Sequence, residues 1–261
     1  MAEPSTHELG PEPHHWEAPI KRDRFVLTRS NKALCIFVHG FFGVAKATWG
    51  DLLEAIRQHA HQDAVLNNWD HAFIGYDWAS IPSFLDIADI IATTIVDAQN
   101  AQHGFSEKYT RFVLIGYSLG TLGIRQLLCN CQRQPPKLLA QLKAVVLIGS
   151  PIVGSAIALA GSKLTARLGV IPILDQLGFA SPAIRSLKDW TSCGYAGHPW
   201  PTVEMYVGIH DWVAHGTARS LVHWAGDNRH ANTLMSGHDL NSATSGGRAS
   251  LVWSVLRSAL R

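Results

Sequence analysis

One stretch of fifteen residues, Arg111 to Arg125, constrains the fold of this chain more than any other; it reads RFVLIGYSLGTLGIR. Its first half contains an apolar run, Phe112 to Ile115, that is typical of a buried strand, and its second half has the spacing of an apolar helical face. The sequence G-Y-S-L-G lies between them, with Ser118 at its centre. This pattern predicts a sharp strand-to-helix turn that presents Ser118 as a nucleophile, with its hydroxyl exposed at the turn.

The neighbours of Ser118 fit such a turn. Glycines at positions 116 and 120 suit it, because larger side chains two residues away from a strained nucleophile would collide. The following helix points its N-terminus at the site, so the backbone N–H of Leu119 can stabilise an oxyanion. A structural turn whose serine only caps a helix is the alternative, and the flanking strand and helix favour the nucleophile.

Further apolar runs alternate with helical patterns along the chain. Helix starts are expected in the intervening segments, and Ser83 with Asp86 resembles a capping box before a long amphipathic pattern. The alternation predicts an α/β fold of three layers, with a mainly parallel central sheet and helices on both faces. The predicted strands are Leu34 to Val38, Ala72 to Tyr76, Phe112 to Ile115, Ala144 to Ile148 and Val203 to Val207, with a short edge strand at Phe25 to Leu27.

The loop after the first buried strand reads HGFFG, His39 to Gly43. A backbone N–H at this position, best that of Phe41, can meet the N–H of Leu119 and complete an oxyanion hole with two donors. Gly40 permits the close approach. An ordinary glycine-containing loop is the alternative, because the HG pair is short and common.

Two further residues complete a candidate catalytic group. Asp211 closely follows the strand Val203 to Val207, and a carboxylate there can lie at the same end of a parallel sheet as Ser118 and orient an imidazole. Asp227 is the second choice for the acid. His238 would be read as a surface histidine in isolation, but the order Ser118, Asp211, His238 matches the nucleophile, acid and base of this architecture.

The chain is expected to form one domain, residues 20–261, behind a mobile proline-containing arm at residues 1–19. The segment 152–200 is too long for a plain connection and rich in apolar residues, so it is either a cap or lid over the site or a core-packed helical hairpin. Ser150 is interpreted as part of a turn, because Pro151 forbids the helical geometry of a nucleophile turn directly after it.

Composition excludes several other classes of protein. The chain has 261 residues, with 22 Lys and Arg against 20 Asp and Glu, which gives no reason to expect a nucleic-acid surface. No signal peptide and no membrane span are expected, and the sequence contains no phosphate-binding loop and no H-E-x-x-H motif, so a cytoplasmic protein without cofactor or metal is expected, with contact to a membrane surface left open. The four cysteines are interpreted as free thiols.

These features together resemble the α/β-hydrolase superfamily, in particular compact serine esterases and lipases related to the GPI inositol-deacylase-like group. The matching pieces are HGFFG with Trp49 following, GYSLG, GSPIVGS, VGIHDWV and SGHD. The resemblance implies a triad of Ser118, Asp211 and His238. The nucleophile turn of the family often has the sequence GHSMGG, whereas Tyr117 and Thr121 replace its histidine and its last glycine here. The segment before the first buried strand is also shorter than the leading antiparallel strands that are usual in the family.

The leading interpretation is a serine hydrolase that cleaves carboxylic esters, including lipid-like acyl esters, through an acyl-enzyme on Ser118. An acyltransferase or thioesterase could use the same triad, and a non-catalytic binding protein of this fold is the alternative from another class. The residues expected to bind the substrate are Phe42, Tyr117, Ile152, Ile157 and Leu159.

Overall fold

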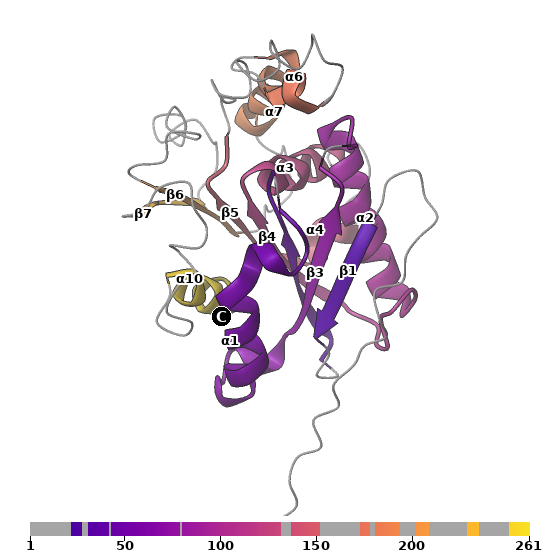
Figure 1. The fold of residues 1–261 in the computed structure, drawn as a ribbon, viewed down its shortest axis with the longest axis vertical. Helices are drawn as coiled ribbons and strands as arrows, with labels where there is room; N and C mark the ends of the chain where they lie inside the picture. The colour runs from indigo at the N-terminus through magenta and orange to yellow at the C-terminus, as the bar shows by residue number, and fades with distance from the viewer. Residues whose placement is uncertain are drawn as a thin grey trace, which may run out of the picture.

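A computed structural model describes residues 22–27, 31–41, 43–78, 80–131, 137–151, 173–177, 181–193, 202–208, 229–234 and 251–261 of the chain. Seven strands form one sheet in the order β1-β3-β2-β4-β5-β6-β7 (Figure 1). The strands are β1 (Arg22–Leu27), β2 (Ala33–Val38), β3 (Asp70–Tyr76), β4 (Arg111–Tyr117), β5 (Leu142–Ile148), β6 (Thr202–Gly208) and β7 (Arg229–Leu234).

The sheet is mainly parallel, as predicted. The strands β2 to β7 pair in parallel with their neighbours, and β1 pairs antiparallel with β3 at the edge. The predicted edge strand is therefore present, and it begins at Arg22 instead of Phe25. Within the residues that the structure describes, β1 is the one antiparallel strand that precedes the parallel strands.

Helices cover both faces of the sheet, which confirms the three-layer fold. The helices α2 (Phe84–Asn100) and α3 (Leu119–Cys131) lie on one face, and α1 (Gly50–His59) and α10 (Leu251–Leu260) lie on the other (Figure 1). Successive side chains of a strand point to opposite faces. In β2 this sends Leu34 and Ile36 into the core beneath α2 and α3, and Cys35 and Phe37 into the core beneath α1 and α10.

The remaining described helices are short or lie in connections. They are α4 (Lys137–Gln141), α6 (Ile173–Leu177), α7 (Pro182–Cys193) and the 3-10 turns η1 (Ala47–Trp49), η2 (Ala60–Gln62) and η3 (Leu66–Asn68).

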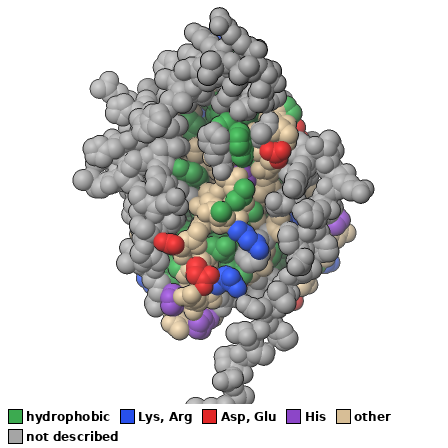
Figure 2. All heavy atoms as spheres, in the orientation of Figure 1, with side chains coloured by type: hydrophobic (Ala, Val, Ile, Leu, Met, Phe, Trp, Pro, Cys, Tyr) green, Lys and Arg blue, Asp and Glu red, His purple; other side chains and the backbone are tan. Residues whose placement is uncertain are grey.

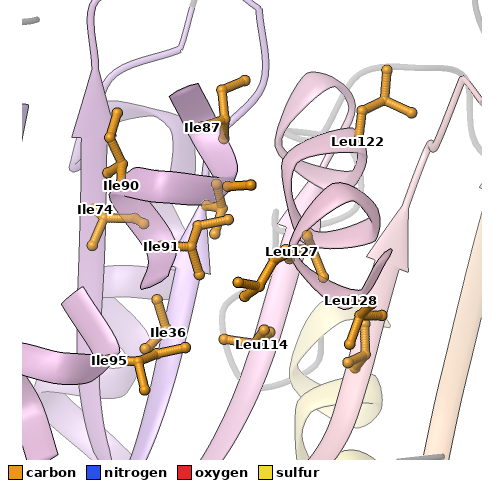
Figure 3. Packing of buried hydrophobic residues seen from close by; sticks show 14 of the residues in the cluster. Ile36, Ile74, Ile87, Ile90, Ile91, Ile95, Leu114, Leu122, Leu127 and Leu128 are labelled. Carbon is orange, nitrogen blue, oxygen red and sulfur yellow. The ribbon is translucent and has the colours of Figure 1, made fainter. Parts of the chain in front are cut away.

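The predicted amphipathic helix after β3 is α2, and its whole apolar stripe is buried. Ile90 and Ile95 lie beside Ile74 and Ile36 of the sheet, and Ile91 lies on the side of α2 that is nearer to Leu127 of α3 (Figure 3). The start of α2 differs from a capping box, because the Ser83 hydroxyl donates to the Asp86 carboxylate (2.7 Å) and makes no bond to a backbone N–H. The stripe comprises Phe84, Ile87, Ile91, Ile95 and Ala98.

The described part of segment 152–200 packs as helices on the core. Buried apolar residues of α6 and α7 belong to the same cluster as α2 and α3; they are Ile173, Leu177, Ile184 and Leu187. The buried Arg125 side chain of α3 donates from Nη2 to the Leu187 carbonyl (3.3 Å), and burial lowers the pKa of this guanidinium to about 10. These contacts favour the helical-hairpin interpretation for α6 and α7.

The face drawn in Figure 2 carries acidic and basic side chains next to one another, so charges of both signs are mixed on its described part. Hydrophobic side chains reach this face in several separate groups (Figure 2). Among the helices that the structure describes, none has the length and apolar character needed to cross a membrane.

The first turn of α3 packs against the end of β2, and this contact leads to a prediction about stability. A Cβ atom at Gly120 would collide with the carbonyl oxygens of Val38 and His39, which belong to the buried centre of the sheet and its loop. Gly120→Ala is therefore expected to lower the free energy of unfolding by roughly 1–3 kcal/mol, measured by denaturant unfolding, despite the higher helix propensity of alanine.

Gly123→Ala is the matched comparison on the same helix. Its added Cβ would meet the side chain of Ile87 on α2, and a side chain between two helices adjusts more easily than strand carbonyls. Gly123→Ala should therefore lower the free energy of unfolding by less than Gly120→Ala does. A Gly120→Ala protein as stable as the parent would contradict the close contact between α3 and β2.

Candidate active site

Ser118 occupies the turn that the sequence predicts. The strand β4 ends at Tyr117 and α3 begins at Leu119, and between them Ser118 has a φ of +49°. This left-handed conformation is uncommon for residues other than glycine, and it persists where surrounding bonds enforce it. The Ser118 N–H donates to the carbonyl of Ile148 at the end of β5 (2.9 Å), and the Ser118 carbonyl accepts from the N–H of Thr121 (3.0 Å).

The exposure of Ser118 differs from the prediction. The sequence predicts a hydroxyl that is exposed at the turn, whereas the residue as a whole is only 7% exposed. The HG loop accounts for part of this cover, because a Cβ atom built on Gly40 would lie 2.7 Å from the Ser118 Cβ. Ser118 therefore stands in a covered position against the backbone of the loop after β2.

The glycines around Ser118 are explained by contacts with backbone. At Gly116 a Cβ would lie 3.0 Å from both the Cα and the N atom of Thr121, so glycine lets the first turn of α3 lie close to β4. At Gly40 a Cβ would also lie 3.0 Å from the Tyr117 Cδ1, which places the Tyr117 ring beside the HG loop. Tyr117 is partly exposed at this edge of the sheet.

His39 holds the HG loop by a defined set of hydrogen bonds. It is fully buried, and its Nε2 accepts the Tyr76 backbone N–H (3.1 Å). Since Nε2 accepts, the neutral ring carries its hydrogen on Nδ1, which donates to the Gly40 carbonyl (2.8 Å). The Tyr76 hydroxyl, whose pKa is raised by burial, stays protonated and donates to the His39 carbonyl (2.6 Å), while the two rings stack.

This arrangement orients the peptide between Gly40 and Phe41. Its carbonyl accepts from His39 and from the Gly43 N–H (3.1 Å). No described peptide bond is cis, and in a trans peptide the N–H points opposite to the carbonyl. The Phe41 N–H is therefore directed away from His39 by bonds made to the other side of the same peptide.

An aromatic pair lies beside this loop. The rings of Phe41 and Trp78 are 4.6 Å apart, and both side chains are partly buried against the core. They follow the ends of β2 and β3, whose carboxyl ends lie at the same edge of the sheet as the end of β4. No pattern in the sequence predicts a role for Trp78, because only the contact between the two loops reveals it.

The other predicted site residues fall elsewhere in the chain. Six of them lie outside the described residues, namely Asp211, His238, Phe42, Ile152, Ile157 and Leu159. The strands that precede the acid and the base are described: β6 ends at Gly208 and β7 at Leu234. Both are parallel to the strands on the Ser118 side, so their carboxyl ends lie at the edge where Ser118 lies.

Thr121 and Ser150 are further polar residues at the turn. The Thr121 hydroxyl lies 2.5 Å from the Ser118 carbonyl oxygen and 2.7 Å from the Ser150 hydroxyl, and both residues are fully buried. The sequence indicated Thr121 only as a departure from the family motif and Ser150 only as part of a turn. Their contact joins positions 29 residues apart, so no local pattern predicts it.

The described cysteines are free thiols. Burial raises the pKa of the Cys35 and Cys131 thiols, which disfavours the reactive thiolate. Neither of these two thiols is therefore an activated competitor of Ser118.

A family model described as "Putative serine esterase (DUF676)" matches residues 28–178, more than half of the chain. The chain belongs to this family. Membership agrees with the predicted carboxylic ester hydrolase, and the matched segment contains both the HG loop and Ser118. The closer resemblance to the GPI inositol-deacylase-like group stays a prediction. A search of curated proteins finds no match.

Solved structures of α/β-hydrolases share the fold. A monoacylglycerol lipase from Paleococcus ferrophilus has a TM-score of 0.60 at 14% identity, covering 92% of this chain and 98% of that one. A soluble variant of monoglyceride lipase from Saccharomyces cerevisiae has a TM-score of 0.60 at 13% identity, covering 97% and 96%. A lipase from Bacillus licheniformis has a TM-score of 0.58 at 18% identity, covering 91% and 97%. These similarities confirm the α/β-hydrolase fold.

Proposed function

We propose that the protein hydrolyses carboxylic esters in two steps, with Ser118 forming a covalent acyl-enzyme. The observation that carries this proposal is the left-handed conformation of Ser118 between β4 and α3 (φ +49°). A strained serine at a strand-to-helix turn is the geometry of a nucleophile in this fold. The covered position of Ser118 also favours reaction with a bound acyl group, because less water surrounds the hydroxyl.

The oxyanion of the tetrahedral intermediate would be stabilised by the N–H groups of Phe41 and Leu119. The contact of Gly40 with Ser118 supports this pairing, since it brings the loop that contains Phe41 next to the nucleophile. Leu119 is the first residue of α3, where backbone N–H groups have no partner within the helix. Preorganised donors of this kind usually make the largest single contribution to such catalysis.

Proton transfer is assigned to His238, oriented by Asp211. Ser118 Oγ bonds to the acyl carbon as its proton passes to His238, and the proton then goes to the leaving alcohol as the ester C–O bond breaks. Water repeats the sequence and releases the acid. The parallel direction of β6 and β7 supports this assignment, because both residues follow the carboxyl ends of strands within a few positions.

The acyl group is proposed to be apolar and lipid-like. The pair of Phe41 and Trp78 offers an aromatic surface beside the loop that contacts Ser118. The predicted substrate-binding residues Ile152, Ile157 and Leu159 would add to it. A buried methylene contributes about 0.8 kcal/mol, so each carbon that finds apolar surface can raise kcat/KM about fourfold.

Nitrophenyl esters of increasing acyl length test this proposal. The protein is expected to hydrolyse them, with kcat/KM rising from acetyl to medium chains because each added methylene is removed from water. Trp78→Ala should flatten the rise with little effect on the acetyl ester. Polar substitutions at Ile157 and Leu159 should do the same.

Val96→Ala is the control for loss of an apolar side chain, because Val96 is half exposed on α2. It should leave the chain-length profile unchanged. A folded protein that turns over none of the esters would contradict ester hydrolysis. A flat profile in the parent protein would leave hydrolysis standing and remove the lipid-like preference.

A further inference from the structure

Two buried hydroxyls lie on the carbonyl side of the peptide between Ser118 and Leu119, whose N–H is one of the proposed oxyanion donors. The Thr121 hydroxyl lies 2.5 Å from the Ser118 carbonyl oxygen and 2.7 Å from the Ser150 hydroxyl. Thr121 lies in the first turn of α3, and Ser150 follows the end of β5. Neither side chain is exposed to solvent. The pair therefore connects the turn around Ser118 to the neighbouring strand.

The direction of the two hydrogen bonds follows from the chemistry of the groups. A carbonyl oxygen only accepts, and a hydroxyl has one hydrogen to donate. The Thr121 hydroxyl therefore donates to the Ser118 carbonyl, and the Ser150 hydroxyl donates to the Thr121 oxygen. Because hydrogen bonds in a chain polarise one another, Ser150 makes Thr121 a stronger donor.

The carbonyl that receives this chain belongs to the peptide between Ser118 and Leu119. In a trans peptide the Leu119 N–H points opposite to that carbonyl, so bonds to the oxygen set the direction of the N–H. The Thr121 N–H donates to the same oxygen (3.0 Å), so two donors hold it. Withdrawal of electron density by these donors also makes the Leu119 N–H a better donor.

We propose that Thr121, supported by Ser150, is a positioning residue for the oxyanion hole: it holds and polarises the Ser118–Leu119 peptide so that the Leu119 N–H meets the developing oxyanion. This inference rests on the proposed ester hydrolysis at Ser118. It goes beyond the motif, because Thr121 stands where the family motif has a glycine, which has no hydroxyl. His39 makes the equivalent hydrogen bond at the other proposed donor, because its Nδ1 donates to the Gly40 carbonyl of the peptide that contains the Phe41 N–H (2.8 Å).

A purely structural role explains this bond less well. The Ser118 carbonyl already accepts the Thr121 N–H, so the hydroxyl is not needed to satisfy that oxygen. The additional bond therefore matches a requirement for direction and polarisation more closely than a requirement for helix stability.

Thr121→Val tests the inference, because valine keeps the shape of the side chain and removes the hydroxyl. We expect kcat for a nitrophenyl ester to fall about ten- to thirty-fold with KM within about twofold, below the hundred-fold or greater loss for deleting an oxyanion donor itself. Affinity for a boronic acid that forms a tetrahedral adduct on Ser118 should fall by a similar factor. Thr121→Ser, which retains the hydroxyl, should restore most of kcat.

Thr94→Val is the matched control. Thr94 is also a buried threonine whose hydroxyl donates to a carbonyl of its own helix, that of Ile90 (2.9 Å), but it lies on α2 away from the turn. This variant should change thermal stability and leave kcat and boronate affinity unchanged. The difference between the two valine variants isolates the effect at the turn from the loss of one buried hydroxyl.

Ser150→Ala tests the second member of the chain. It should lower kcat a few-fold in the parent protein and have no further effect in the Thr121→Val protein, because it acts only through Thr121. If Thr121→Val does not fold, Ser150→Ala with the boronate measurement carries the test alone, and an unchanged kcat and boronate affinity would overturn the inference.

The outcomes separate this inference from the proposed function. A Thr121→Val protein with parental kcat and boronate affinity, and a stability loss like that of Thr94→Val, overturns the positioning role while hydrolysis at Ser118 stands. Undiminished turnover by Ser118→Ala would instead remove the proposed function. Equal losses of kcat in Thr121→Val and Thr121→Ser would show that the methyl packing matters and not the hydroxyl, which also overturns the inference.

Discussion

Ser118→Ala is expected to lower kcat for ester hydrolysis about a million-fold while the protein keeps its fold. The hydroxyl carries the covalent step, so its removal leaves only background hydrolysis. The turn itself should survive, because it is held by backbone bonds that alanine retains, from the Ser118 N–H to the Ile148 carbonyl and from the Thr121 N–H to the Ser118 carbonyl. Initial rates on a nitrophenyl ester, together with thermal unfolding, measure both parts of the prediction.

Covalent labelling gives a second measurement of the same change. A fluorophosphonate should modify the parent protein on the peptide that contains Ser118 and should not modify Ser118→Ala. Ser106→Ala is the control, because Ser106 is exposed in the loop before β4, at the opposite end of that strand from Ser118. Turnover that persisted in Ser118→Ala, with normal turnover in Ser106→Ala, would rule out Ser118 as the nucleophile.

The fold and the nucleophile turn could be predicted because their signals are local. The strands β2, β4 and β5 are buried on both faces. Such strands can be recognised in a sequence because they consist of several apolar residues in succession. The turn at Ser118 requires small residues at fixed offsets, and the contacts at Gly116 and Gly120 show which backbone atoms impose that requirement. Both features depend on neighbours in the chain.

The parts that could not be predicted depend on contacts between distant residues. The bond from Ser150 to Thr121 joins the loop after β5 to the first turn of α3, and the pair of Phe41 and Trp78 joins the loops after β2 and β3. The covered position of Ser118 has the same origin, because the loop at Gly40 packs against it. A pattern along the chain contains no information on which distant segments meet, so these contacts could not be predicted from the sequence.

The segment 152–200 illustrates a second limit. A core-packed helix and a lid over a binding site both need an apolar face, so composition cannot separate them. The described part of the segment makes hydrogen bonds to core helices: the Gln176 side chain accepts the Phe84 N–H at the start of α2 (3.2 Å), and the Leu187 carbonyl accepts from Arg125 of α3. Polar bonds to two core helices anchor this part of the segment.

Asp211→Asn is expected to lower kcat up to about ten-thousand-fold while KM and stability change little. The proposed role of the carboxylate is to accept a hydrogen from His238 and hold the ring in the tautomer that can take the Ser118 proton. Asparagine keeps the shape but favours the wrong tautomer, so the base is lost without a change in packing. The assignment rests on β6, which runs parallel to β5 and ends at Gly208, three positions before Asp211.

Asp227→Asn provides the comparison, because Asp227 is the second choice for the acid in the sequence. In the sequence it precedes the first residue of β7 by two positions, so we expect it at the amino end of that strand, whereas the site is expected at the carboxyl ends. A carboxylate at the amino end is far from an imidazole that follows the carboxyl end of the same strand, since six residues of strand span about 20 Å. Asp227→Asn should therefore leave kcat within a few-fold of the parent. A large loss in Asp227→Asn with near-normal kcat in Asp211→Asn would transfer the role of the acid to Asp227 and leave Ser118 and His238 in place.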